Sequence, residues 1–164
     1  MKRMRLLLAG LAVGLGLAPS TVLAAGTYSE SIFGIETGFN PSPASCQRNE
    51  QSSFAGTAIG TLNGTFQISV CHTPVAPNAM ITGGTYTVTN QATTLTGNFV
   101  PGGSVTPVGL SNSGALCVQK YAVSGRLTPG GDFGGILTHV GFAANGSCSV
   151  FIAFITGTAL INGP

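Results

Sequence analysis

Few side chains in this sequence have the chemistry of an acid, a base or a nucleophile. Beyond residue 24, His72 and His139 are the groups whose ordinary titration lies near neutral pH. The formally ionised groups in the same region are Glu30, Glu36, Arg48, Glu50, Lys120, Arg126 and Asp132. If the protein is an enzyme, we expect it to use polar groups gathered around one predicted hairpin, and the first candidates are His139, Tyr121, Asp132, Arg126 and Lys120.

The spacing of these groups matches no strong catalytic motif. A nucleophile elbow requires the pattern G-x-S-x-G, and the nearest stretch, residues 109–113, ends in serine. His139 lies in an apolar run, where a hydrogen-bonded structural histidine is the simpler interpretation. Asp132 follows a Gly-Gly pair, so we interpret it as a turn residue that pairs with Arg126 across the hairpin. We therefore predict no catalytic residue and no cofactor, and we assign no binding residue.

The four cysteines predict two disulfide bonds rather than a metal site. Cys46, Cys71, Cys117 and Cys148 are even in number and widely spaced. This pattern is typical of exported domains whose modest core is supplemented by disulfides. A structural zinc site usually contains C-x-x-C pairs, and this sequence has none. We therefore expect no bound metal.

The first 24 residues predict export. Residues 1–5 are basic, residues 6–17 are apolar and residues 22–24 offer a small-residue cleavage pattern, which together describe a secretory signal peptide. After cleavage three cations and four anions remain, a formal net charge of −1. No basic patch is left to bind nucleic acid or an anionic membrane. We expect a secreted, periplasmic or cell-surface protein with no nucleic-acid partner and no transmembrane segment after signal cleavage.

Residues 25–52 are predicted to form an irregular N-terminal arm in front of the folded domain. Apolar residues in this segment follow no sustained period, Pro41 and Pro43 interrupt it, and it holds three of the four acids outside the signal peptide. We expect its apolar side chains to pack onto the domain. The alternative is a lid over a cavity.

Residues 53–164 are predicted to form one all-β domain. Thr, Val, Ile and Phe recur in short runs that Gly, Pro and Asn interrupt, which is typical of β-strands joined by turns. Asn63-Gly64 and Asn145-Gly146 are strong hairpin signals, and this role explains them more simply than use as N-glycosylation sites. Pro107 predicts an edge or a bulge. The eight runs are residues 53–62, 65–71, 80–89, 93–100, 104–110, 115–128, 133–143 and 148–161.

Short connections favour an antiparallel β-barrel of about eight strands, with a two-sheet β-sandwich as the alternative. Either fold would cover the last run, which is apolar on both faces. In an up-and-down order, Cys46 and Cys71 lie at one end and Cys117 and Cys148 at the opposite end, which predicts the pairs Cys46–Cys71 and Cys117–Cys148. The second pair spans two strand spacings, about 10 Å, so it requires the chain to bend inward.

Three classes of function agree with these features. The favoured class is a non-catalytic binding module, because an eight-stranded barrel encloses one small ligand and an apolar lining selects an apolar one. The alternative is a structural or self-associating cell-surface protein, since a net charge near zero permits association. The least favoured class is a barrel enzyme with few acid or base groups. The expected partner is thus an unidentified small apolar ligand, a surface partner or a second copy of the chain.

Overall fold

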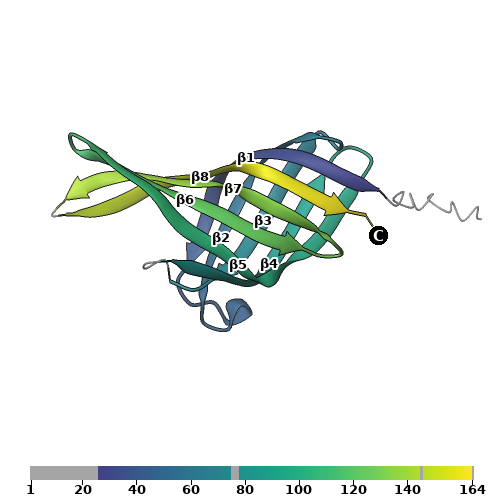
Figure 1. Ribbon diagram of the computed structural model, residues 1–164, viewed down its shortest axis with the longest axis horizontal. Coiled ribbons are helices and arrows are strands. Elements are labelled where there is room, and N and C mark those ends of the chain that lie inside the picture. Colours follow the sequence, from purple (N-terminus) through teal and green to yellow (C-terminus); the bar gives the residue numbers. More distant parts are fainter. Residues whose placement is uncertain (1–25, 75–77, 145, 164) are drawn as a thin grey trace, which may run out of the picture.

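The computed structural model describes residues 26–74, 78–144 and 146–163, and these form a closed antiparallel β-barrel (Figure 1). Each strand pairs with its neighbours in the sequence, and the last strand closes the ring on the first. The barrel prediction is therefore confirmed over the sandwich. The elements are β1 (Thr27–Asn40), a 3₁₀ turn η1 (Ala44–Cys46), β2 (Glu50–Gly60), β3 (Gly64–His72), β4 (Ala79–Thr89), β5 (Thr94–Ser113), β6 (Leu116–Leu127), β7 (Gly131–Ala144) and β8 (Ser147–Asn162).

The structure differs from the sequence prediction over residues 25–52, because β1 is an integral strand of the ring. It pairs with β2 on one side and with β8 on the other. Along β1, Glu30 and Ile32 are buried while Ser31 and Phe33 are exposed. This alternation is hard to see in the sequence, since an acid occupies an inward position and apolar residues occupy outward ones. The irregular part of the predicted arm is confined to residues 41–49.

Strand β5 is the second difference, since it joins two of the predicted runs into one strand of 20 residues. Its pairing with β6 shifts between Val100 and Ser104 and again between Pro107 and Gly109. Bulges of this kind keep a strand continuous while its register changes. The prediction of a bulge or edge at Pro107 is confirmed. The expected total of eight strands is correct, but β1 takes the place of the run that merges into β5.

Apolar side chains that alternate along the strands fill one half of the barrel. The Phe99 ring makes edge-to-face contacts with the rings of Tyr86 and Phe133, at centroid distances of 6.2 and 6.1 Å respectively. Aromatic rings favour this geometry. At this closed end of the barrel, the buried Glu30 carboxylate accepts a 2.7 Å hydrogen bond from the Leu62 backbone N–H. Other core residues include Ile32, Phe66, Ile68, Val88, Leu95, Leu127, Ala159 and Ile161.

The opposite end, which we call the mouth, carries two hairpins that reach well beyond the other strands (Figure 1). The β5–β6 hairpin turns between Ser113 and Leu116, and the β7–β8 hairpin turns between Ala144 and Ser147. Residues 106–116 are all exposed, so both faces of this part of the sheet are in contact with solvent. We call the part of β5–β8 beyond the rim the extension.

Both predicted disulfides are present, Cys46–Cys71 with a Cα–Cα distance of 5.4 Å and Cys117–Cys148 with 5.9 Å. The prediction that they lie at opposite ends is wrong. Because two runs merge into β5, the direction of β6 and β8 reverses relative to the expectation, and all four cysteines lie at the mouth.

The Cys117–Cys148 bond spans β7 at a glycine. Cys117 pairs with Gly141, and a Cβ on Gly141 would collide with the Ser149 carbonyl oxygen and lie 3.0 Å from Cys148 Sγ. The absence of a side chain therefore lets β6 and β8 approach across the strand between them.

The predicted signal peptide, residues 1–24, and Asn145 lie outside the described residues. Among the helices that are described, none has the length and apolar character required to cross a membrane. Two disulfides suit an oxidising compartment.

Candidate functional site in the barrel mouth

A cavity of about 510 Å³ opens at the mouth, above the aromatic core. Apolar side chains from all eight strands line it, together with polar side chains from β1, β2, β3 and β7. Its volume lies in the range typical of small-molecule sites. The lining residues are Glu36, Phe39, Glu50, Ser52, Phe54, Val70, His72, Ile81, Val105, Val123, Leu137, His139, Val150 and Ile155.

Strand register brings the polar residues of β1, β2 and β3 together. Glu50 lies directly opposite His72 in the β2–β3 pairing. Ser52 follows Glu50 by two positions, so both side chains lie on the inner face of β2. Glu36 lies opposite Phe54 on the neighbouring strand β1. Two carboxyl groups, a hydroxyl and an imidazole therefore share one side of the mouth.

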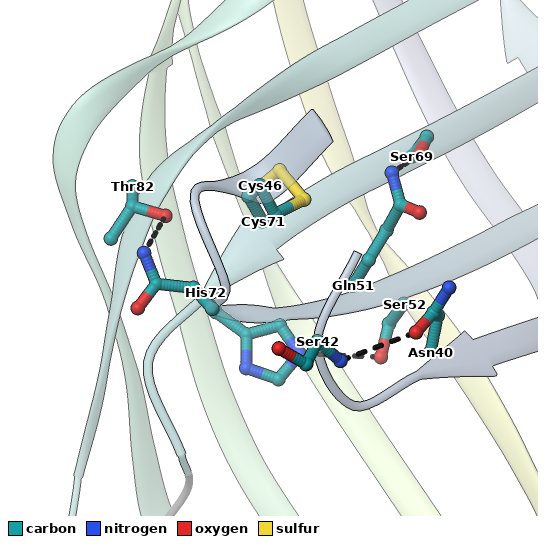
Figure 2. Close-up of a disulfide and its surroundings, with 10 residues drawn as sticks. Asn40, Ser42, Cys46, Gln51, Ser52, Ser69, Cys71, His72 and Thr82 are labelled. Atoms are coloured by element: carbon teal, nitrogen blue, oxygen red, sulfur yellow. Dashed lines mark hydrogen bonds between the residues drawn. A yellow bond between two sulfur atoms is a disulfide. The ribbon is translucent and has the colours of Figure 1, made fainter. Parts of the chain in front are cut away.

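His72 is the centre of this polar group. Its Nε2 lies 3.3 Å from Ser52 Oγ, and its Nδ1 lies 2.9 Å from the Thr73 carbonyl oxygen and 3.6 Å from Glu50 Oε2. Both His72 and Ser52 are buried. Figure 2 shows the His72 ring and Ser52 beside the Cys46–Cys71 disulfide, which attaches the segment after β1 to the end of β3.

The partners of His72 determine its tautomer. A carbonyl oxygen only accepts hydrogen bonds, so the short contact to Thr73 requires the proton on Nδ1. In the neutral ring Nε2 is then an acceptor, and the Ser52 hydroxyl donates to it. This is the arrangement that activates a hydroxyl or moves a proton through it.

Glu36 lies at the other side of Ser52. Burial raises the pKa of Glu36, and a hydrogen bond with Ser52 and the charge of His72 oppose that rise. The carboxyl group is thus coupled to the imidazole through one hydroxyl. The neutral acid persists to higher pH than in an exposed glutamate.

His139 enters the cavity from β7. Its ring lies 5.2 Å from that of Tyr121, whose hydroxyl donates to Gln119 Oε1 over 3.3 Å. Burial lowers the pKa of His139, and the charge of His72 lowers it further. In the described part of the chain, no protein group hydrogen-bonds to either ring nitrogen of His139, so both nitrogens are available to a ligand.

The candidates chosen from the sequence divide into two groups. His139 lines the cavity, and Tyr121 packs against it. Lys120, Arg126 and Asp132 are exposed on the outer wall, where Arg126 and Asp132 lie opposite each other as the hairpin interpretation predicts.

Sequence reasoning did not assign Glu36, Glu50, Ser52 or His72 to a site. The available signal was the position of His72 directly after one predicted run and of Glu50 and Ser52 just before the preceding one. A hairpin centred on Asn63-Gly64 necessarily places these ends side by side. Only the inclusion of β1 in the ring brings Glu36 beside them.

Among the described residues, no group of three or more His, Cys, Asp or Glu side chains has the arrangement of a metal site. Comparisons of the chain with protein-family models, with curated proteins and with solved structures found no match. The functional argument therefore depends on the geometry of the cavity.

Proposed function

We propose that the protein is a secreted binding module that holds one small, largely apolar ligand in the mouth cavity. The observation that carries the proposal is the composition of the lining: nine of the fourteen residues are apolar, and the five polar ones come from β1, β2, β3 and β7. Such a cavity favours a ligand with an apolar body, because each Å² of buried apolar surface contributes about 25 cal/mol. The polar lining groups would orient its polar end.

The two disulfides support this function by limiting the loss of conformational freedom on binding. They join β3 to the segment after β1, and β6 to β8, all at the mouth. A site that is already ordered before binding retains more of the contact energy as affinity. The same bonds suit a protein exported to an oxidising compartment.

Binding of a fluorescent apolar dye, together with native mass spectrometry of the exported protein, tests the proposal. Val123→Phe fills the cavity and should weaken dye binding at least tenfold, about 1.4 kcal/mol. Ala122→Phe places the same ring on the outer face of β6 and should leave the affinity unchanged. Thermal unfolding of both variants verifies that each is folded. Equal affinities in two folded variants would show that the dye binds elsewhere.

Self-association is the second candidate function, and the extension favours it. The last β5 residue paired with β4 is Val105, and the first β8 residue paired with β1 is Phe154, so each edge of the extension has free backbone groups. Unpaired apolar edges are templates for pairing with another chain. The exposed apolar side chains of the extension are Val108, Leu110, Leu116, Phe142, Val150, Phe151 and Ile152.

Sedimentation velocity at increasing protein concentration tests this candidate. Phe142 and Phe151 are in ring contact, with centroids 4.9 Å apart. We expect the double substitution of both by Ser to abolish concentration-dependent association. Phe33→Ser is a matched control, because Phe33 is equally exposed but lies on the barrel wall. A monomer at every concentration for the unchanged protein would exclude the candidate.

A further inference from the structure

We propose that the mouth of the cavity is a proton-transfer site that enolises a small apolar carbonyl compound. In this reaction His139 is the base, Glu36 is the acid, and Ser52 connects Glu36 to His72. The inference depends on the proposed function, because the reaction requires a ligand in the cavity.

The register of three strands places the acid and the base at one height on the barrel wall. His139 pairs with Ala153 of β8, and Ile35, the residue before Glu36, pairs with Phe154. Glu36 and His139 therefore flank Ala153 across two strand spacings, about 10 Å between backbones. Since Ala153 is small, it leaves space between the two flanking side chains, and both Glu36 and His139 line the cavity.

The side chains of Glu36, Ser52 and His72 form a series that can hold one mobile proton. Ser52 has a single hydroxyl hydrogen, and it lies between the Glu36 carboxyl and His72 Nε2. Two arrangements satisfy every partner: a neutral acid with a neutral imidazole, or a carboxylate with an imidazolium. Moving one proton through the hydroxyl converts the first into the second. His72 can thus accept the Glu36 proton through the hydroxyl and give it back, whereas a proton that Glu36 has given to the carbonyl oxygen returns to Glu36 from the enol O–H.

Desolvation assigns the two roles. Burial raises the pKa of Glu36 and lowers the pKa of His139, so both groups favour their neutral forms. A neutral carboxylic acid donates a hydrogen bond to a carbonyl oxygen, and a neutral imidazole accepts a proton. Among the described residues that line the cavity, none is a lysine or an arginine that would reverse this preference.

Atoms and electrons balance without a co-reactant. His139 removes a proton from the carbon next to the carbonyl, and the electrons of that C–H bond form the C=C bond of an enol. The carbonyl π electrons take the Glu36 proton as the O–H bond forms. The reverse steps, with protonation on the same or another carbon, regenerate the carbonyl and both neutral side chains. The reaction class is deprotonation and isomerisation next to a carbonyl.

The titratable groups that face the site from the surrounding strands are Glu36 on β1, Glu50 on β2, His72 on β3, Tyr121 on β6 and His139 on β7. We expect the rate to fall at low pH as His139 is protonated and at high pH as Glu36 ionises.

Deuterium exchange into 2-indanone tests the proposal. The ketone is incubated with the exported protein in D₂O, incorporation next to the carbonyl is followed by mass spectrometry, and binding is followed by ligand-detected NMR. We expect saturable exchange above the buffer rate, reduced about 100-fold in Glu36→Gln and in His139→Gln. Lys120→Gln, a substitution on the outer wall of β6, should leave the rate of deuterium exchange into 2-indanone unchanged.

Ser52→Ala separates a relay from a purely structural role. If Ser52 connects Glu36 to His72, its removal should displace the alkaline limb of the pH profile as well as reduce the rate. A lower rate with an unchanged profile would exclude the relay.

The outcomes separate the two proposals. Binding of 2-indanone in the cavity without exchange above buffer, or with full exchange in Glu36→Gln and His139→Gln, would overturn the catalytic inference and leave the binding function intact. Binding of an apolar dye but not of 2-indanone would exclude small ketones as the substrate class and overturn it too. Failure to bind any apolar compound would contradict the proposed binding function as well.

Discussion

Glu30 shows how strongly position controls an ionisable residue in this barrel. It is fully buried at the closed end, where one carboxylate oxygen accepts from the Leu62 N–H and the other, Oε2, has no hydrogen-bond partner among the described residues. The role of Glu30 is therefore to complete the hydrogen bonding of the backbone around the β2–β3 turn.

We predict that Glu30→Ala lowers the free energy of unfolding by about 1 to 3 kcal/mol, because it leaves a buried N–H without an acceptor. Glu30→Gln keeps an acceptor oxygen and should lower the free energy of unfolding by less. Urea unfolding of the two variants measures the difference. Equal stabilities would mean that the hydrogen bond to Leu62 contributes nothing.

His139 should make stability depend on pH in a particular direction. Because burial lowers the pKa of His139 below its ordinary value of 6.5, the unfolded chain binds a proton there more readily than the folded chain does. The contribution of His139 to the free energy of unfolding is therefore fully present above pH 6.5. It is lost as the pH falls below that value toward the pKa of His139 in the folded protein. We predict that His139→Gln reduces this acid-side loss.

Urea unfolding at about pH 7.5 and about pH 5.5 measures the effect. The loss of stability between the two values should be smaller in His139→Gln than in the unchanged protein. His72→Gln is a necessary comparison, because His72 is the other histidine that lines the cavity. An identical loss in His139→Gln would contradict a lowered pKa.

At the scale of elements, β7 depends on one glycine. A Cβ at Gly141 would meet both the Ser149 carbonyl oxygen and Cys148 Sγ, whereas a Cβ at Gly134 on the same strand would meet no atom within 4 Å. We predict that Gly141→Ala destabilises the fold by about 1 to 3 kcal/mol, while Gly134→Ala changes stability by no more than about 0.5 kcal/mol.

Thermal unfolding, with titration of free thiols, compares the two variants. Gly141→Ala should also leave a fraction of Cys117 and Cys148 unpaired, because the alanine side chain occupies the space the disulfide crosses. Fully formed disulfides and equal stabilities in both variants would refute this view of β7.

The strands were predictable from the sequence to different degrees. The β2–β3 hairpin follows from Asn63-Gly64, whose asparagine has the expected positive φ of 52°. Strand β6 follows from local alternation, and β7 and β8 follow from apolar runs bounded by turn residues. The sequence pattern missed β1 because Glu30 faces inward while Phe33 and Ile35 face solvent. It divided β5 because bulges interrupt the period of two.

At the scale of the whole molecule, the two ends of the barrel are stabilised differently. The closed end holds the aromatic core, and the mouth holds the cavity and both disulfides. With sequence separations of 25 and 31 residues, each bond contributes about 3 to 4 kcal/mol on the chain-entropy model. Reduction should therefore loosen the mouth before the core.

Hydrogen exchange of the oxidised and reduced protein measures this difference. We predict that amides near His72 and Cys117 lose protection on reduction, while those near Phe66 and Phe99 keep theirs up to the global unfolding limit. A uniform loss along all strands would show that the barrel unfolds as one unit.

The sequence by itself determined the all-β class and the turns that join consecutive strands, because turn chemistry and alternation along each strand are local properties. The predicted strand total and cysteine pairs agree with the structure, but they came from an order that missed β1 and divided β5. The tertiary structure alone decided that β1 closes the ring, that both disulfides lie at the mouth, and that Glu36, Ser52, His72 and His139 share one cavity. Those properties depend on register between strands far apart in the chain, because a shift of one residue would turn each of these side chains to the opposite face.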